Sequence, residues 1–294
     1  DVNTAAVDGT TALHWSVYHD DVELTSMLLD AGADTDAVNR NGATPLTLAC
    51  TNSNPEMVTR LLAAGADANR APTGEPPLLT CARTGQVGAV RALRAAGADI
   101  DAVDDWRGQT PLMWAAANNN AAAIQLLAEQ GADINAKTDN PSRSSDRTFA
   151  YAPPTGFSAL MFAVRAGHID ATRVLLDAGT DVNDTVSDGE SALVIAAANA
   201  NWELAAYLLD RGADANHAAA GWNALHQTVR TRRMNVGFGT PGPFAAGTLD
   251  SIDLIRKLLT QGVDVNATQG DGATALHWAA HRDDAVTAAL LIEE

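Results

Sequence analysis

The chain has 294 residues, and 46% of them are hydrophobic, so it is long enough to bury a sizeable core. Nineteen lysines and arginines against 36 aspartates and glutamates give a formal net charge of −17. Such an acidic surface repels nucleic acid phosphates and anionic lipids, so we expect no nucleic-acid partner. No apolar run approaches the roughly 18 residues that span a bilayer. We therefore expect a soluble chain without membrane insertion, cytoplasmic or, if a signal peptide is removed, periplasmic or secreted.

The first predicted element follows Gly9, in the segment GTTALHWSVYHDD (residues 9–21), which holds two histidines, a tryptophan and two aspartates. Near the other end, GATALHWAAHRDD (residues 272–284) repeats the same residue at eight of thirteen positions. Between them, a glycine before a similar Thr/Ser/Pro–Ala/Pro–Leu pattern recurs at spacings of 33, 32, 34, 48, 33, 32 and 51 residues. One unit of about 33 residues is therefore repeated, with two interruptions. The glycines that open the units are Gly9, Gly42, Gly74, Gly108, Gly156, Gly189, Gly221 and Gly272.

Each unit is predicted to form two short helices followed by a turn. Thr44 before Pro45 is typical of a helix N-cap with proline at the first helical position. A second helix, for example over residues 56–64, carries leucines on one face, and Gly65 ends it as a left-handed cap. The Asp-x-Asn that follows supplies side-chain hydrogen bonds for a turn. The glycines that end second helices are Gly32, Gly65, Gly97, Gly131, Gly179, Gly212 and Gly262, and a leucine stands four residues before each.

No single unit can cover its own apolar face, so the units must stack into a solenoid. The segment NGATPLTLACTNSNPEMVTRLLAAGADANRA (residues 41–71) resembles an ankyrin repeat in its length, caps and leucines, and the resemblance covers essentially the whole chain. It implies an all-α fold, an α-solenoid of helix–turn–helix units with protruding β-turn loops. We expect one domain over residues 1–294, with eight units. The Leu-His-Trp phrases and the abundance of alanine and arginine also resemble ankyrin-repeat proteins of bacteria.

Both ends of the chain fall inside a repeat. Residues 1–3 align with residues 264–266, which close a unit, and the last residues stop where a Gly-Ala-Asp is due. Because solenoid arrays need polar capping units at their ends, we expect the chain to be a piece of a longer protein.

The histidines of the Leu-His-Trp segments, His14, His226 and His277, lie five residues after their unit glycines. The family resemblance implies that they are structural and hydrogen-bond the loops of adjacent units. The alternative, a metal face shared by His277 and His281, lacks further ligands. We therefore expect no metal and no cofactor. The tryptophans that follow one residue later are expected to fill the core between units: Trp15, Trp114 and Trp278.

Two cysteines and one acidic segment are also given structural interpretations. Cys50 and Cys81 stand where other units have alanine, and two cysteines are too few for a disulfide framework or a zinc site. We interpret both as buried core thiols, which leaves the redox compartment undecided. The segment DIDAVDD (residues 99–105) suggests calcium, but it lacks the spacing and the closing glutamate of an EF-hand, so we favour a solvated loop.

The two interruptions are candidate functional loops. The first insert, residues 140–154 between units four and five, carries Phe149 and Tyr151 among serines and prolines. The second insert, residues 232–249 within unit seven, carries Arg232, Arg233 and Phe238 among glycines and prolines. Long loops in a compact array are usually either functional or disordered. A tolerated insertion and a binding loop are weighed equally here, because arginine and aromatic residues are typical of interfaces.

The loop tips and the first helices offer two further surfaces. Most tips hold small or polar residues, but three hold aromatic residues, Trp106, Phe157 and Trp222, and we expect Phe157 to be covered by the first insert. Trp106 and Trp222 are the candidate anchors. The positions nine and ten residues after the unit glycine are expected to line the concave face, and they include arginine but no acidic residue. The candidates there are Tyr18, His19, Arg83, Arg165, Arg230, His281 and Arg282.

These patterns favour a non-catalytic, monomeric scaffold that binds a protein or peptide partner through loop tips, the concave first-helix face and the inserts. A neutral-to-basic groove would receive an acidic or extended peptide. One alternative is an enzyme or a protein that binds a small anion beneath the inserts with Arg232 and Arg233, although no nucleophile–base pair or phosphate loop supports it. The other alternative is a rigid spacer between domains. The fold alone does not choose among them.

Overall fold

The computed structural model describes residues 1–138, 155–232 and 247–293. These residues form sixteen helices and no strand, apart from two isolated bridges in loops. Contacts divide the chain into two compact units, Asp1–Pro153 and Pro154–Glu294. The all-α prediction is confirmed, whereas the single domain and the unit boundaries stay predictions.

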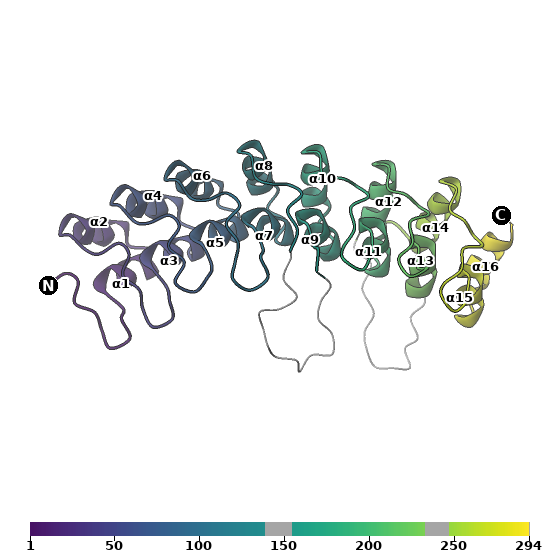
Figure 1. Cartoon of the computed structure of the whole chain (residues 1–294), viewed down its shortest axis with the longest axis horizontal. Coiled ribbons are helices and arrows are strands. Elements are labelled where there is room, and N and C mark those ends of the chain that lie inside the picture. The colour runs from purple at the N-terminus through teal and green to yellow at the C-terminus, as the bar shows by residue number, and fades with distance from the viewer. Residues whose placement is uncertain (139–154, 233–246, 294) are drawn as a thin grey trace. The chain divides into compact units, whose positions relative to one another are not determined.

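Each repeat contributes a first and a second helix, and these alternate along both compact units (Figure 1). The N-terminal unit contains α1 (Ala12–Tyr18), α2 (Val22–Asp30), α3 (Pro45–Thr51), α4 (Pro55–Ala63), α5 (Pro77–Thr84), α6 (Val87–Ala95), α7 (Pro111–Ala117) and α8 (Ala121–Glu129). The C-terminal unit contains α9 (Ala159–Ala166), α10 (Ile169–Asp177), α11 (Ala192–Ala198), α12 (Trp202–Asp210), α13 (Ala224–Arg232), α14 (Ser251–Thr260), α15 (Ala275–His281) and α16 (Ala285–Ile292).

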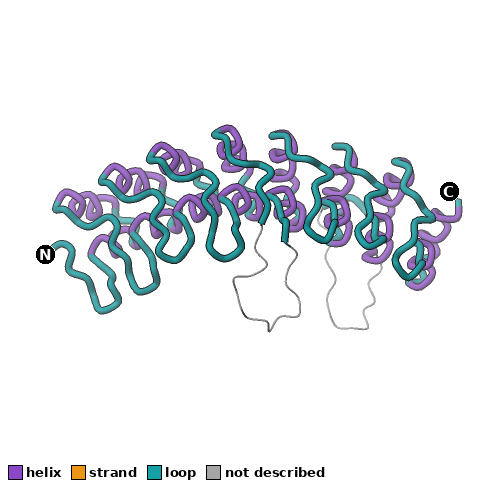
Figure 2. The backbone as a smooth tube through the Cα atoms, viewed as in Figure 1, coloured by secondary structure: helices purple, strands orange, loops and turns teal. Residues whose placement is uncertain are grey.

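Within the N-terminal unit the helices form two layers. The first helices α1, α3, α5 and α7 pack side by side in one layer, and the second helices α2, α4, α6 and α8 pack in the other. The loops that precede the first helices extend beyond the first-helix layer, away from the second helices (Figure 2). First helices and loop tips therefore share one side of this unit.

The helices begin and end at capping residues that recur from one repeat to the next. Thr44 Oγ1 accepts a hydrogen bond from the backbone N–H of Thr47 at 3.2 Å, and the Thr47 hydroxyl accepts one from Thr44 N–H at 2.9 Å. This reciprocal cap satisfies two backbone donors that the helix leaves free. After the second helix of the same repeat, α4, Gly65 has φ +98°, a left-handed conformation that other residues rarely adopt. The N-cap and C-cap predicted for this repeat are confirmed.

The Asp-x-Asn turns join neighbouring repeats by hydrogen bonds. The backbone N–H of Asp67 donates to Asp36 Oδ1 at 3.0 Å, and that of Asp99 donates to Asn69 Oδ1 at 2.9 Å. The N–H of Asp133 donates in the same way to Asp101 Oδ1 at 2.9 Å. Asp101 thus has a structural role in the stack.

The core of each unit is built from the leucines of the second helices and the small residues of the first helices. Leu61, Leu93, Leu127, Leu175, Leu208 and Leu258, which stand four residues before the second-helix glycines, are fully buried. Ala115 and Ala116 of α7 are also fully buried. Small residues at these positions let the first helices approach closely.

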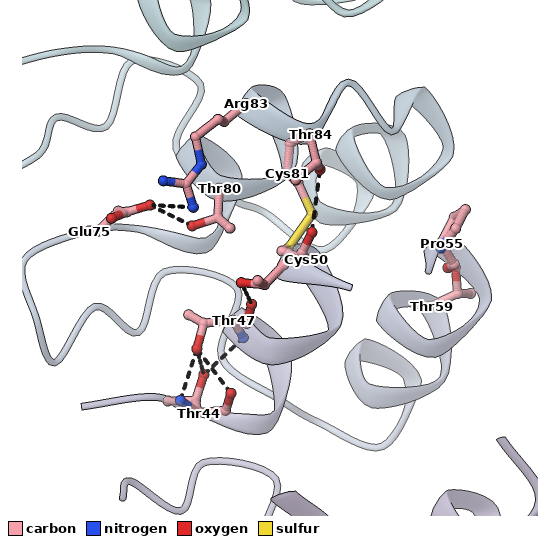
Figure 3. Close-up of a disulfide and its surroundings, with 11 residues drawn as sticks. Thr44, Thr47, Cys50, Pro55, Thr59, Glu75, Thr80, Cys81, Arg83 and Thr84 are labelled. Carbon is pink, nitrogen blue, oxygen red and sulfur yellow. Dashed lines mark hydrogen bonds and ion pairs between the residues drawn. A yellow bond between two sulfur atoms is a disulfide. The ribbon is translucent and has the colours of Figure 1, made fainter. Parts of the chain in front are cut away.

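The interpretation of Cys50 and Cys81 as free thiols is wrong, because the two residues form a disulfide bond (Figure 3). The bond joins α3 to α5, and its Cα atoms lie 4.7 Å apart. Both cysteines are buried, as expected. They stand on neighbouring first helices at positions that several other repeats fill with alanine, and the short distance between their Cα atoms brings the sulfur atoms within bonding reach.

Candidate protein-binding surface

The first-helix face of the N-terminal unit begins with three exposed aromatic side chains on α1. The rings of Trp15 and Tyr18 lie 5.8 Å apart between centroids, and those of Trp15 and His19 lie 5.9 Å apart. Trp15 is 52% exposed and Tyr18 is 58% exposed. The expectation that Trp15 fills the core is therefore wrong.

The histidine before Trp15 explains this orientation. His14 is buried, its Nε2 lies 3.0 Å from the carbonyl oxygen of Ala43 in the next loop, and its Nδ1 contacts the Thr11 hydroxyl. The structural role predicted for His14 is confirmed. The next residue is rotated by about 100° around the helix, so Trp15 shares the outer face with Tyr18, three residues later.

The same face continues through Arg83 and Trp114. The Arg83 guanidinium carbon lies 5.2 Å from the centroid of the Trp114 ring, and Trp114 is half-buried rather than part of the core. Arg83 also lies 3.7 Å from Glu75, which accepts a hydrogen bond from Thr80 at 2.7 Å (Figure 3). The first helices carry no acid at the expected groove positions, but this loop glutamate offsets the charge of Arg83.

The loop before α7 holds Trp106 outward. Trp106 is 79% exposed, whereas Asp104, two residues earlier, is buried. One carboxylate oxygen of Asp104 accepts the backbone N–H groups of Trp106 at 2.9 Å and Arg107 at 2.6 Å, and the other accepts the indole N–H of Trp114 at 3.2 Å. Asp104 thereby joins the backbone of this loop tip to Trp114 on α7.

We expect the Asp104→Ala variant to loosen this tip and to destabilise the N-terminal unit by about 1–3 kcal/mol, because it removes the charged acceptor of three part-buried donors. Amide hydrogen exchange at Trp106 and Arg107 should become faster, while exchange in α2 should stay unchanged. Unchanged exchange at Trp106 would show that Asp104 does not hold the tip.

In the C-terminal unit the two aromatic tip residues are not free. Phe157 is buried and lies 5.4 Å from Phe162 between ring centroids, and Arg165 covers its ring at 4.9 Å. Trp222 is half-buried, and its ring lies 5.5 Å from that of Trp278. Trp278 is itself half-buried, so it too lies at the edge of the core.

Of the remaining candidates, Arg232 is paired, His281 is exposed, and four lie outside the described ranges. Arg232 ends α13 and donates from Nε to Asp284 Oδ2 at 2.8 Å, so this arginine is already neutralised rather than open to an anion. His281 lies exposed beside Trp278, with 5.8 Å between the ring centroids. Phe149, Tyr151, Arg233 and Phe238 lie outside the described residues.

The described part of the chain contains no group of three or more histidine, cysteine, aspartate or glutamate side chains that could hold a metal ion. It also contains no helix long and apolar enough to cross a membrane. His226 is buried, its Nδ1 lies 2.7 Å from Asn223 Oδ1, and burial lowers its pKa. Its Nε2 has no hydrogen-bond partner among the described residues, whereas the Nε2 of His14 reaches the carbonyl oxygen of Ala43.

The family is shown by its sequence pattern. The family described as "Ankyrin repeats (3 copies)" matches residues 1–72, 53–138 and 160–236, and "Ankyrin repeats (many copies)" matches residues 244–292. The chain belongs to the ankyrin-repeat family. Ankyrin repeats generally mediate protein–protein interaction, and the fold is typically a non-catalytic scaffold.

The tyrosine kinase and the potassium channel described next each match a short stretch of this ankyrin-repeat chain. The tyrosine-protein kinase HTK16 of Hydra vulgaris is 45% identical over 49 residues, which are 17% of this chain and 6% of the kinase. The potassium channel AKT1 of Oryza sativa subsp. indica is 51% identical over 49 residues, which are 17% of this chain and 5% of the channel. The crystal structure of the human ASB11 ankyrin repeat domain has a TM-score of 0.67 at 23% identity, covering 86% of this chain and 98% of that one. The structural likeness shows the fold, and the resemblance to bacterial proteins stays a prediction.

In this ankyrin-repeat chain, the sequence interpretation missed two positions of the surface. Residues one and six after the unit glycine lie beside the residue nine after it, as Glu75, Thr80 and Arg83 show. The signal was present, since positions six and nine are three residues apart on one helix and must share a face. Assigning the tryptophans to the core concealed it.

Proposed function

We propose that this ankyrin-repeat chain is a non-catalytic scaffold that binds a protein partner through its first helices and loop tips. The observation that carries the proposal is Trp106, a large aromatic side chain held 79% exposed on a tip that buried Asp104 fixes in place. Exposed, preorganised aromatic residues lose little entropy on binding and are frequent anchors of interfaces.

The aromatic residues of α1 support the same side of the N-terminal unit as the contact surface. Trp15 and Tyr18 are more than half exposed, and they lie on the layer from which the loop tips extend. A partner that covers this layer would bury aromatic area that the chain leaves in water. The acidic net charge of −17 favours a partner that is neutral or basic where it meets the rest of the surface.

A photo-crosslinking experiment tests the proposal. Benzoylphenylalanine is placed at position 106 or 18 of the full chain, and at position 27 as a control. Met27 is 63% exposed, but it lies on second helix α2. In extract of the organism that encodes the chain, we expect the same discrete adduct from positions 106 and 18 and none from position 27.

Competition with chain that carries no crosslinker tests whether these adducts are specific. Unlabelled wild-type chain should suppress them, and the Trp106→Ala/Tyr18→Ala double variant should suppress them at least about tenfold less well, which corresponds to about 1.4 kcal/mol of binding free energy. Equal adducts at all three positions would contradict a defined binding surface. Absence of any adduct would favour the spacer alternative.

A further inference from the structure

A shallow hollow lies on the first-helix side of the C-terminal unit. Its volume is about 210 Å³, and two alanines line it together with Asp188, Glu190, Trp222, Gln227 and Arg230. Trp222 contacts Trp278 at its rim, so residues of three consecutive repeats meet there. We call this region, with Trp278 and Arg282, the C-terminal hollow.

Two arginines of the C-terminal hollow are stacked but not paired. The guanidinium carbon of Arg230 lies 5.1 Å from the Trp222 ring centroid, and that of Arg282 lies 5.9 Å from the Trp278 centroid. Among the described residues, no acidic group lies within 4.0 Å of either guanidinium. Burial, and then the charge of Arg282, lower the pKa of Arg230, although Glu190 opposes this. Two like charges held together in an acidic chain indicate a place for an anionic group.

Unpartnered hydrogen-bonding atoms gather at the same place. Arg230 Nε, Arg282 Nε and Trp278 Nε1 are buried donors that find no acceptor in the described part of the chain. Gln227 is only 6% exposed, lines the hollow, and leaves its Oε1 without a donor. Buried polar groups are rarely left unpaired, because the hydrogen bonds they made with water are lost on burial. These groups therefore indicate a ligand that completes them.

We propose that the C-terminal hollow binds an extended peptide segment through a carboxylate group. The carboxylate lies between Arg230 and Arg282, where it accepts hydrogen bonds and removes the repulsion between the two charges. A backbone N–H of the same peptide donates to Gln227 Oε1, and its apolar stem packs on Trp222. This inference rests on the proposed function, for which it names the chemistry of one partner segment.

The donors favour an acidic over a basic ligand. Three of the four unpartnered atoms above are donors, and a lysine or arginine would add more donors beside two guanidiniums. Glu190 already lies in the field of Arg230, and burial, followed by the charge of Asp188, raises the pKa of Glu190. A ligand carboxylate would compete with Glu190 for Arg230, and Glu190 is the weaker competitor because its anion is poorly stabilised.

The test uses the 15N-labelled full chain and three short peptides. The first is the acetylated, amidated peptide Gly-Ala-Glu-Ala-Gly, the second has Gln in place of Glu, and the third has no Glu but a free C-terminal carboxylate. The readout is the indole N–H resonance of Trp278, assigned with Trp278→Phe. We expect the Glu peptide to shift this resonance with a dissociation constant in the millimolar range, and the Gln peptide to bind at least about tenfold more weakly.

Variants of the chain separate a ligand site from a structural cluster. Arg230→Gln and Arg282→Gln should each weaken binding of the Glu peptide about tenfold, whereas Glu190→Gln should strengthen it because the competing carboxylate is gone. Arg256→Gln is the matched control, since Arg256 lies exposed on α14 beside Asp253 and should leave binding unchanged. The buried Trp202 indole resonance reports whether each variant is folded.

The third peptide shows whether a C-terminal carboxylate binds as well as a side-chain carboxylate, and the comparison of the Glu and Gln peptides decides whether the site exists. Equal binding of the Glu and Gln peptides overturns the inference. So does a missing shift at millimolar peptide, or unchanged binding by folded Arg230→Gln and Arg282→Gln chains. The crosslinks at positions 106 and 18 lie in the other unit, so they test the proposed function separately. If they persist while the peptide fails to bind, only this inference is lost.

Discussion

The Cys50→Ala/Cys81→Ala variant is expected to lose about 3–4 kcal/mol of unfolding free energy in the N-terminal unit. The disulfide bond closes a loop with a sequence separation of 31 residues, and opening it frees the unfolded chain to adopt many more conformations. Alanine stands at the equivalent helix positions of several other repeats, so the substitution fits the packing of α3 against α5. The loss should appear as a lower midpoint in urea unfolding followed by circular dichroism.

Reductant provides the control for this prediction. Dithiothreitol should lower the midpoint of the wild-type chain toward that of the double variant, and it should leave the variant unchanged. Both cysteines are buried, so reduction should be fast only after unfolding. Two free thiols in the denatured, unreduced wild-type chain would contradict the prediction.

This bond makes the stability of the N-terminal unit depend on its surroundings. Disulfide bonds persist in oxidising compartments and are rare where thioredoxin and glutathione keep thiols reduced. Arg83 stands two residues after Cys81, and Thr84 donates from its hydroxyl to the carbonyl oxygens of both cysteines, at 3.3 Å and 3.1 Å. The cross-link therefore also steadies the helix that carries part of the proposed binding surface (Figure 3).

The repeat architecture could be predicted because each of its rules acts locally. Thr44 caps a helix with the backbone of Thr47, and Gly65 ends another by its own conformation, so neither needs information from elsewhere in the chain. A period of about 33 residues then makes every local prediction support the others. The caps and the buried leucines follow from this agreement.

The disulfide bond and the binding surface depend on how neighbouring repeats meet, which a single unit does not encode. Cys50 stands eight residues after its unit glycine and Cys81 stands seven, so alignment of the repeats does not place them opposite each other. Their contact depends on the lateral fit of α3 against α5. In the same way, Trp222 becomes half-buried because Trp278 of the next repeat covers it, whereas Trp106 has no such ring contact among the described residues and is exposed.

The Arg232→Ala variant is expected to destabilise the C-terminal unit by about 3–5 kcal/mol, because it leaves a buried carboxylate without its counter-charge. The Asp284 side chain is 1% exposed, caps α16 through Thr287, and accepts from Arg232 Nε at 2.8 Å. Arg232 also donates to Ser251 Oγ at 2.8 Å, at the start of α14. One guanidinium thus joins α13, α14 and α16.

Two further variants show that the buried charge is the cause. Arg256→Ala removes an arginine from an exposed ion pair with Asp253, and it should cost less than about 1 kcal/mol. Asp284→Asn in the Arg232→Ala background removes the unpaired charge, so the double variant should be more stable than Arg232→Ala alone. If the double variant is less stable by the sum of the two single losses, the two side chains do not act as a pair.

The pH dependence of unfolding should follow the pKa of Asp284. Burial raises this pKa, but the hydrogen bonds from Thr287 and Arg232 outweigh burial and hold it below its ordinary value. The ionised carboxylate therefore stabilises the fold above its unfolded pKa of about 3.9, and this contribution is lost as the pH falls through the lower folded value.

In Arg232→Ala, burial remains while the counter-charge is gone, so the folded pKa should rise. The stability difference between wild type and variant should accordingly be large near neutral pH and should shrink below about pH 4, as urea unfolding followed by circular dichroism would measure. A difference that stays constant with pH would mean that Arg232 acts by packing rather than by charge.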